Sequence, residues 1–423
     1  MGSFSIPLSG LNAAQGELQA ISNNLANSST TGYKDSNLTF SGIFSGASSL
    51  NGAGNAIQTG AGVETAASDV NFTEGALTAT QTSSNMAISG NGFFLTRDPE
   101  GAVTYTRAGD FNTNNSGQIV SPSGGLVLGY PATGGVVNSA GTLGPIQVGS
   151  ANSPAIATTS FQINANLNAS ATVGTTANST LPVYDSLGAA HNLDVTYTNS
   201  GPGAWTYTIS VPNSDLSTGG TGSTQVASGS LSFNSSGNLV MPGTPPATTI
   251  PVTIPPASTP SVTFANGAAP MVMTWNLDDT SGNPTLSQTA TASATPTTSQ
   301  NGFAAGTLSS YAVLPDGTVQ GTFSSGQTMA LGQVAVANFA NTQGLVSVGN
   351  SNYQASAASG SATVGVAGTG GRGTVIGGDT EGSNVDIAKE FANLIVAQQT
   401  YSANAKALTT LTQVSQATMA MIQ

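Results

Sequence analysis

Apolar residues near the start of the chain recur at intervals of three, four and seven positions. The stripe that they form consists of Leu11, Ala14, Leu18, Ile21 and Leu25. This spacing places side chains along one seam of an α-helix and is typical of a helix that packs on another helix. Pro7 is predicted to be the first helical residue, because a proline there loses no hydrogen bond. The helix is predicted to end near Ala26, before the turn-forming residues 27–32.

The C-terminal residues show the same spacing. Their apolar positions are Ile387, Phe391, Leu394, Tyr401, Ala405 and Leu408. Ser383 and Asp386 are spaced as a capping box, which predicts that a helix begins just after them. Lys406 is the only charged residue after Phe391, so nearly the whole helix surface is predicted to face protein. Because helices depend on tertiary packing, both terminal helices are expected to be largely disordered in a monomer and to fold on assembly.

Turn signals and short alternating segments predict β-hairpins between the two helices. Three turns separate such segments: residues 98–101 between 93–95 and 103–105, residues 234–238 between 231–233 and 239–241, and residues 315–317 between 311–313 and 318–319. Each turn contains Gly or Asn, which hairpins need where φ is positive. The predicted fold class is therefore mainly β with paired α-helical termini.

Two low-complexity stretches, residues 149–154 and 289–300, predict the boundaries of a separate β domain. A proline-rich run over residues 242–260 is expected on sheet edges or in extended connections, because proline cannot donate to a ladder. Inserting one domain into another keeps the chain ends together, so that the helices can pair. The predicted division is 1–30 plus 384–423 for a coiled-coil-like helical core, 31–71 plus 376–383 for a connecting segment, 72–148 plus 302–375 for a discontinuous inner β domain, and 149–301 for an inserted outer β domain.

Charge is scarce along the chain: 6% of its 423 residues are charged, and the net charge is −12. Such a surface repels phosphate backbones and lacks the basic patch that binds an anionic membrane, so no nucleic-acid partner is expected. Without cysteine the chain can form neither a disulfide nor a thiolate metal site. A run of about 18 apolar residues is missing, so no membrane insertion is expected, and no cleaved signal peptide is expected either.

No catalytic pattern accompanies these elements. His191 is the only histidine and is predicted to be exposed, or to cap a turn, where a turn meets a strand. Residues 368–373 match the spelling of a dinucleotide-binding loop, but they follow no clear strand, open no helix and are predicted to be a flexible loop. Asp278, Asp279 and Asn283 lack the closing glutamate of a calcium loop and are predicted to form a surface turn. We expect no enzymatic activity, no cofactor and no metal.

Motifs at the two ends of the chain carry a resemblance to a known family. The N-terminal motif is Ser9-Gly10-Leu11-Asn12-Ala13-Ala14, Ile21-Ser22-Asn23-Asn24-Leu25-Ala26-Asn27 and Thr31-Gly32-Tyr33-Lys34. The C-terminal motif is Glu381-Gly382-Ser383-Asn384-Val385-Asp386, Glu390-Phe391 and Gln398-Gln399-Thr400-Tyr401-Ser402-Ala403-Asn404-Ala405-Lys406. Together these motifs resemble the two ends of bacterial flagellar rod and hook proteins.

Further segments narrow the resemblance to the hook members of that family. Residues 166–170 and 183–188 are similar to the opening of the extra outer domain, and residues 317–319, 326–327, 331–339 and 344–345 are similar to the return into the inner β domain. Two departures remove possible ion pairs between subunits, each worth roughly 0–1 kcal/mol. Gln399 stands where many relatives carry Arg, and no acidic residue lies near Thr412 and Gln413.

The resemblance implies a structural subunit that assembles with itself into a helical homopolymer. That polymer would be a bendable tube, a universal joint that transmits torque from the motor rod to the filament. The implied partners are the distal rod, hook-cap, hook–filament junction and hook-length-control proteins and the flagellar export apparatus, and the implied location is extracellular, in the hook attached to the basal body. The residues implied in assembly are Leu11, Leu18, Ile21, Asn23, Asn24, Leu25, Asn27, Gly32, Tyr33, Lys34, Phe391, Leu394, Ile395, Gln398, Tyr401, Asn404 and Leu408.

Alternatives remain open for these residues and for the whole chain. The leucines are expected to pack either within one subunit's helix pair or between subunits. The asparagines are expected to route the chain, to contact a neighbouring subunit or simply to end the helix, and residues 32–34 to shape the turn that leaves the helical core. The rival functions are a distal flagellar rod subunit and, from another class, a secreted β-rich adhesin or carbohydrate-active protein.

Overall fold

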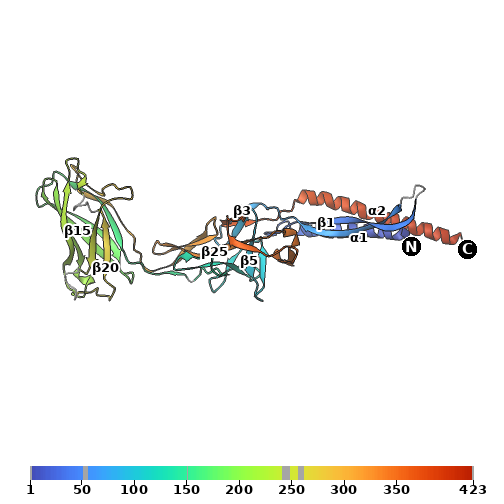
Figure 1. Cartoon of the computed structure of the whole chain (residues 1–423), viewed down its shortest axis with the longest axis horizontal. Helices are drawn as coiled ribbons and strands as arrows, with labels where there is room; N and C mark the ends of the chain where they lie inside the picture. Colours follow the sequence, from blue (N-terminus) through green and yellow to red (C-terminus); the bar gives the residue numbers. More distant parts are fainter. Residues whose placement is uncertain (1, 51–55, 150, 241–247, 256–261, 422–423) are drawn as a thin grey trace. The chain divides into compact units, whose positions relative to one another are not determined.

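The computed structural model describes residues 2–50, 56–149, 151–240, 248–255 and 262–421. It contains two α-helices, α1 (Gly2–Ala26) and α2 (Ile387–Ala420), which lie side by side (Figure 1). Nearly all other regular structure is β-strand. The predicted mainly β chain with paired helical termini is therefore confirmed.

The chain divides into two compact units. Unit 1 comprises Met1–Ser150, Ser310–Gly321 and Met329–Gln423, and unit 2 comprises Ala151–Ser309 and Thr322–Thr328. The change of unit near residue 150 falls inside the first predicted boundary stretch. The second stretch, residues 289–300, is not a boundary, because its strand β22 (Ala294–Gln300) pairs with β13 (Ser160–Asn168) inside unit 2. The four-part division itself stays a prediction.

Helix α1 is packed between α2 and a long antiparallel hairpin. The hairpin consists of β1 (Ser36–Leu50) and β2 (Ala56–Val70), within the segment expected to be a connector. The helix begins at Gly2, so the prediction that Pro7 opens it was wrong; Pro7 lies buried in its second turn, where its missing N–H removes one helical hydrogen bond.

The buried side of α1 contains only part of the predicted stripe. Ala14 and Ile21 of the stripe are buried, and so is Pro7, whereas Leu11, Leu18 and Leu25 are partly exposed. Because α2 contacts one side of α1 and the hairpin another, both sides are partly covered. The three leucines lie at the edges of the covered sides. Two glycines allow these close contacts.

The first of these glycines, Gly10, faces α2. A Cβ at Gly10 would lie 2.9 Å from the side-chain amide of Asn404. The second, Gly62 of the hairpin, has φ +119°, and a Cβ there would collide with the hydroxyl of Ser9. That hydroxyl accepts a hydrogen bond from the N–H of Val63 (3.1 Å) and donates one to the carbonyl of Ile6 (2.8 Å). Glycine therefore fixes how closely α1 meets its two neighbours.

The N-cap of α2 is Asp386. Its carboxylate accepts hydrogen bonds from the backbone N–H groups of Ala388 (2.9 Å) and Lys389 (3.2 Å). Ser383 is not the cap, so the predicted capping box was wrong; its hydroxyl accepts from the N–H of Val385 instead. Asp is itself among the best N-cap residues, and it stands next to the first helical residue.

The β part of unit 1 is built around one large sheet. Its main path runs β24-β25-β9-β5-β6-β27-β26. The turns at 98–101 and 315–317 connect β5 to β6 and β23 to β24, which confirms two predicted hairpins. The strands are β3 (Leu77–Ala79), β4 (Met86–Ser89), β5 (Phe93–Arg97), β6 (Val103–Thr106), β7 (Asn112–Thr113), β8 (Ile119–Val120), β9 (Leu126–Thr133), β10 (Val136–Val137), β11 (Gly144–Pro145), β23 (Gly306–Val313), β24 (Thr318–Phe323), β25 (Thr328–Asn338), β26 (Val346–Gly349), β27 (Asn352–Gln354), β28 (Thr363–Val366), β29 (Thr374–Gly377) and β30 (Asp379–Glu381), with a 3₁₀ turn at Thr342–Gly344.

Successive residues of β5 serve two different cores in unit 1. Phe94 packs edge-on against Phe111 on one side, with ring centroids 5.2 Å apart. Phe93 packs on the other side against Phe339 and Tyr353. The period of two in side-chain direction explains this division.

Unit 2 is a pair of sheets around a shared core. One is antiparallel, in the order β14-β15-β16-β17-β18, and the other has the order β19-β20-β13-β21 with β22 beside β13. Both tryptophans of the chain, Trp205 and Trp275, are fully buried in this core. The remaining bounds are β12 (Asn152–Ser153), β14 (Thr176–Tyr184), β15 (Ala190–Gly201), β16 (Ala204–Pro212), β17 (Ser223–Phe233), β18 (Leu239–Val240), β19 (Thr249–Ile254), β20 (Met271–Asn276) and β21 (Leu286–Thr289), with a 3₁₀ turn at Asn213–Asp215.

The sequence patterns in unit 2 agree with this arrangement in two places. The turn at 234–238 joins β17 to β18, which confirms the third predicted hairpin. Pro251 lies in β19 at the edge of its sheet, as expected for a residue that cannot donate to a ladder. Pro255 lies buried directly after β19, and the prolines at 242–247 and 256–260 lie outside the described residues.

Candidate assembly surface and the junction at its base

A buried ionic cluster joins the two ends of the chain to the β part of unit 1. Glu381, the last residue of β30, has no exposed surface. Its two carboxylate oxygens bind the ammonium of Lys34 (Nζ–Oε1 2.5 Å) and the guanidinium of Arg107 (Nη1–Oε2 3.2 Å). One carboxylate therefore connects the segment after α1, the segment after β6 and the segment before α2.

Backbone carbonyl groups accept further hydrogen bonds from the two cations of this junction. Lys34 also donates to the carbonyl of Thr73 (2.6 Å), and Arg107 donates to the carbonyls of Ile88 (3.1 Å) and Gly90 (2.6 Å). Burial lowers the pKa of Lys34, and the attraction of Glu381 offsets this only in part. Because desolvation makes such charges costly unless they are paired, loss of Glu381 would leave two cations buried without a counter-ion.

Three predicted site residues lie in this junction, inside one subunit. Gly32 has φ +66°, and its N–H donates to the carbonyl of Glu381 (2.8 Å). A Cβ at Gly32 would lie 2.3 Å from the backbone nitrogen of Ala108, so only glycine fits. The hydroxyl of Tyr33 donates to Asn24 Oδ1 (3.1 Å), and burial, followed by the charges of Asp35 and Glu390, raises the pKa of Tyr33.

The predicted asparagines at the end of α1 have two different roles. Asn24 is buried and holds Ser36 at both its N–H (3.1 Å) and its carbonyl (3.0 Å), so it routes the chain from α1 into β1. Asn27 donates to both the carbonyl and the side chain of Asn23 (2.9 Å each) and closes the helix end.

Arg107 is a junction residue that the sequence did not reveal, and Asn384 belonged to the C-terminal motif but carried no predicted role. Asn384 accepts from the N–H of Asp35 (2.8 Å) and donates to the carbonyl of Asn71 (2.8 Å). The scarcity of charge was the one available signal. In a chain with only six cations, a buried cation is expected where a counter-ion is fixed beside it. Glu381 belonged to the C-terminal motif but carried no predicted role.

Apart from Leu11, Leu18, Ile21 and Leu25 of α1, the other predicted site residues lie along α2, most of whose residues are exposed. Of its 34 residues only Glu390 and Ala397 are buried. Leu394, Asn404 and Leu408 are half-buried, and Asn404 lies against Gly10 of α1. The exposed predicted residues of α2 are Phe391, Ile395, Gln398 and Tyr401.

We name the exposed apolar side chains of this helix the α2 surface. They include Phe391 (49% exposed) and Ile395 (55% exposed), one helical turn apart on the same side. An apolar surface of this kind is typical of a contact with another protein. The full set is Ile387, Phe391, Ile395, Val396, Tyr401, Val414 and Met419.

His191 differs from its prediction, because it is buried inside unit 2. Only 5% of it is exposed, and it stacks against Phe264 with centroids 4.6 Å apart. Its Nε2 lies 3.0 Å from Asp185 Oδ2, and its Nδ1 lies 3.0 Å from Asp215 Oδ2. Strand β15 places the ring beside a turn that carries Asp185 and a 3₁₀ turn that carries Asp215, and sequence spacing does not reveal this contact.

The remaining candidate sites are ordinary turns. Residues 368–373 connect β28 to β29 by hydrogen bonds that include Gly368 N–H to Gly373 carbonyl (2.9 Å), so a strand does precede them, contrary to prediction, but no helix follows. Asp279 accepts from the N–H groups of Ser281 and Asn283 (2.8 Å each), which confirms a surface turn. Across the described ranges, no cluster of three metal-binding side chains occurs and no helix is long and apolar enough to cross a membrane.

Comparison with known families defines the class of this chain. Four family profiles match it along its length: "Flagella basal body rod protein" at residues 6–34, "Flagellar hook protein FlgE/F/G D1 domain" at 87–170, "Flagellar basal body protein FlaE D2 domain" at 150–303 and "Flagellar basal body rod FlgEFG protein C-terminal" at 377–421. The fold and the profiles together define an axial protein of the bacterial flagellum.

Full-length relatives identify the family within that class. The chain is 35% identical to the flagellar hook protein FlgE of Salmonella typhimurium, over 97% of this chain and 98% of the relative, and 35% identical to that of Escherichia coli with the same coverage. The crystal structure of Helicobacter pylori flagellar hook protein FlgE2 aligns with a TM-score of 0.48 at 13% identity, over 71% of this chain and 99% of that one. The chain belongs to the flagellar hook protein family and is a structural subunit of the hook.

Proposed function

We propose that this chain polymerises head to tail into the tube of a bendable hook, a universal joint that transmits torque from the motor rod to the filament. Subunits that use two different complementary surfaces form an open helical polymer when their rotation does not close a ring. The terminal helices line the inside of that tube, and the β parts of units 1 and 2 form its outer layers.

The observation that carries this proposal is the α2 surface. A long helix with two buried residues draws only part of its possible stability from packing within its own subunit, and most helical stability comes from packing. Its exposed side chains are apolar at Phe391 and Ile395, and only Lys389, Glu390 and Lys406 carry charge. A helix of a neighbouring copy suits this surface, since it can cover the exposed apolar side chains and meets few charges that would repel it.

Bending needs weaker contacts in the outer layers than in the inner one. Unit 2 encloses its own core and presents a polar, weakly charged exterior, so neighbouring units can shift against one another without breaking ion pairs. The earlier expectation that the terminal helices order only on assembly stays a prediction; slow amide exchange in α2 of the monomer would contradict it.

The location and the accessory partners follow from the family. We propose that the subunit is extracellular, that it leaves the cell through the flagellar export apparatus, and that its assembly involves distal rod, hook-cap, hook–filament junction and hook-length-control proteins. No enzymatic activity, cofactor, nucleic-acid partner or membrane insertion is part of this proposal.

Negative-stain microscopy of three forms tests the proposal. The wild-type chain is expected to form curved tubes, whereas a Phe391→Asp, Ile395→Asp variant is expected to stay monomeric at the same concentration. Val272→Asp is the control, because Val272 is an apolar residue on β20 of unit 2 that is at least as exposed as Phe391 and Ile395. Tubes from the double variant would show that the α2 surface does not drive assembly.

The shape of the tubes separates the proposed function from its alternatives. Straight, rigid tubes would favour a distal rod subunit. Deleting residues 151–309 is expected to change curvature while tubes persist, because that block belongs to unit 2. A secreted adhesin or carbohydrate-active protein would remain monomeric and would bind or cleave its ligand without the helices.

A further inference from the structure

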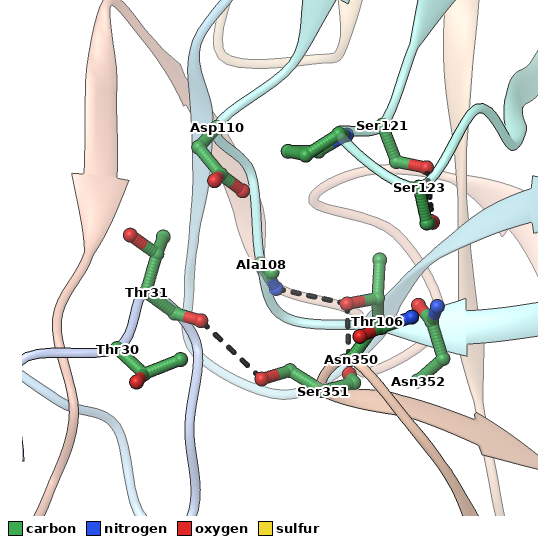
Figure 2. A pocket seen from close by; sticks show the side chains of 11 residues that line it. Thr30, Thr31, Thr106, Ala108, Asp110, Ser121, Ser123, Asn350, Ser351 and Asn352 are labelled. Carbon is green, nitrogen blue, oxygen red and sulfur yellow. Dashed lines mark hydrogen bonds between the residues drawn. The ribbon is translucent and has the colours of Figure 1, made fainter. Parts of the chain in front are cut away.

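A polar pocket of about 420 Å³ lies in unit 1, apart from the α2 surface. The loop after α1, the segment after β6, the turn at residues 121–123 and the tip of the β26–β27 hairpin form its walls (Figure 2). Its size lies within the range of sites that accept a small ligand or a side chain.

Asp110 is the single charged residue among those that line this pocket. Figure 2 shows its carboxylate directed into the space between the labelled side chains. One of its oxygens, Oδ1, is buried and has no hydrogen-bond partner among the described residues. A carboxylate oxygen in this state is costly within one subunit, because its hydration is lost without replacement.

Several neighbouring hydroxyl groups already have partners. Ser121 and Ser123 share a hydrogen bond (2.9 Å), and Thr106 donates to the carbonyl of Ser351 (2.9 Å). Asn350 and Ser351 form the two-residue hairpin tip, both with the positive φ that this turn needs. Hydrogen bonds therefore hold part of the walls in place, and among the described residues Asp110 Oδ1 is the buried side-chain atom of this pocket that has no partner.

Three of the six cations of the chain are held by ion pairs or hydrogen bonds within the subunit. Lys34 and Arg107 pair with Glu381, and Arg372 donates to the carbonyl of Val366 (3.0 Å) and to Thr369 (2.9 Å). The other three cations form no ion pair with the part of the chain that the structure describes; they are Arg97, Lys389 and Lys406.

We propose that the Asp110 pocket receives a cationic side chain of a neighbouring copy of this chain. This inference rests on the proposed polymer, which brings copies into contact, and it assigns the pocket as a second contact besides the α2 surface. The unpaired carboxylate supplies the opposite charge, and the surrounding hydroxyl and amide oxygens accept the further N–H groups of a guanidinium or ammonium. A divalent cation is a poorer match, because it prefers several carboxylate ligands and this pocket has one.

The first test measures the critical concentration of tube assembly in full-length protein at low and high salt. Asp110→Asn is expected to raise it at least threefold at low salt and to flatten its salt dependence, because an inter-subunit ion pair is screened. Glu100→Gln is the matched control, since Glu100 is an exposed carboxylate in the turn between β5 and β6. Equal effects of the two substitutions would overturn the inference.

A charge exchange identifies the occupant. Asp110→Lys is expected to weaken assembly more than Asp110→Asn, and combining it with Arg97→Asp, Lys389→Asp or Lys406→Asp is expected to restore at least half of the loss in one combination. Restoration by none of the three would contradict the proposal. Calcium binding to the wild-type monomer that Asp110→Asn abolishes, measured by calorimetry, would also overturn it in favour of a metal site.

The result for the Asp110 pocket can be distinguished from the result for the proposed polymer. If the wild-type chain forms no tubes under any condition, the polymer proposal fails. If it forms tubes on which Asp110→Asn has no effect, the pocket proposal alone fails.

Discussion

Helix α2 and the β15 strand of unit 2 show opposite ways of using a chain with few charges. In β15 every second side chain from His191 to Asn199 is buried, and the neighbouring strands and the second sheet close over them. In α2 only Glu390 and Ala397 are buried, and large apolar side chains remain in solvent. Unit 2 therefore completes its core within one subunit, whereas α2 presents a surface that only another molecule can cover.

The largest effect is expected where the helices join the β part of unit 1. Glu381→Gln would leave Lys34 and Arg107 buried without a counter-ion, and removing one partner of a buried pair typically costs about 3–5 kcal/mol. Urea unfolding followed by far-UV circular dichroism measures this loss. The fluorescence of Trp205 and Trp275, which reports on unit 2 alone, is expected not to change its midpoint. If Glu381→Gln unfolded at the wild-type urea concentration by both probes, the junction would not be an important source of stability.

Truncating one leucine in β15 and one in α2 tests the difference between these two elements most directly. Leu193→Ala in β15 is expected to destabilise unit 2 by about 3 kcal/mol, because it opens a cavity in a closed core. Leu394→Ala in α2 is expected to cost the monomer less than about 1 kcal/mol, since the side chain is already partly exposed. Tryptophan fluorescence in urea measures the first and circular dichroism at 222 nm the second. Equal losses would mean that α2 is stabilised as strongly within the subunit as unit 2 is.

Acid is expected to weaken unit 2 through the carboxylate beside His191. Burial raises the pKa of Asp185, but hydrogen bonds from Asn266, His191 and two backbone N–H groups lower it by more, so the folded pKa is below the ordinary value. A depressed folded pKa stabilises the protein above the unfolded pKa, near about 3.9, and this stabilisation is lost as pH falls through the folded value. The urea midpoint from tryptophan fluorescence, measured from pH 7 to pH 2.5, should fall less steeply in Asp185→Asn. An identical fall in both proteins would assign the acid sensitivity to other groups.

The smallest effect is expected at the start of α2. Asp386→Ala removes the side-chain acceptor for the N–H groups of Ala388 and Lys389 and is expected to cost about 1 kcal/mol of helix stability. Helicity at 222 nm during thermal melting measures it. Ser383→Ala serves as the control and should have little effect, because Ser383 lies outside the helix. A larger loss of helicity from Ser383→Ala than from Asp386→Ala would support the capping box after all.

Sequence periodicity predicted the elements better than the surfaces that they bury. The stripe of Leu11, Ala14, Leu18, Ile21 and Leu25 correctly predicted α1, but of these residues only Ala14 and Ile21 are buried. A heptad assumes one partner helix, and α1 has a hairpin on another side. The three hairpin turns were predictable because their chemistry is local, and the same holds for the turn at Asp279.

The ionic contacts were not predictable, because their partners are distant in sequence. Lys34 is 347 residues from Glu381, and Arg107 is 274 residues from it. His191 meets Asp215 across 24 residues, through a 3₁₀ turn that no periodicity announces. Burial of a charged side chain depends on which segments meet, and a single sequence does not contain that information.

The position of Glu381 has a kinetic consequence. Contacts between residues far apart in the chain form late in folding, because the entropy of closing the intervening loop is lost before the contact can repay it. Lys34 can therefore pair with Glu381 only when almost the entire polypeptide is available, whereas the hairpins of unit 2 form between strands that are adjacent in sequence. The subunit acquires its finished ends last, and a chain released before residue 381 would hold folded β-sheet but would not yet have the junction that orients its helices.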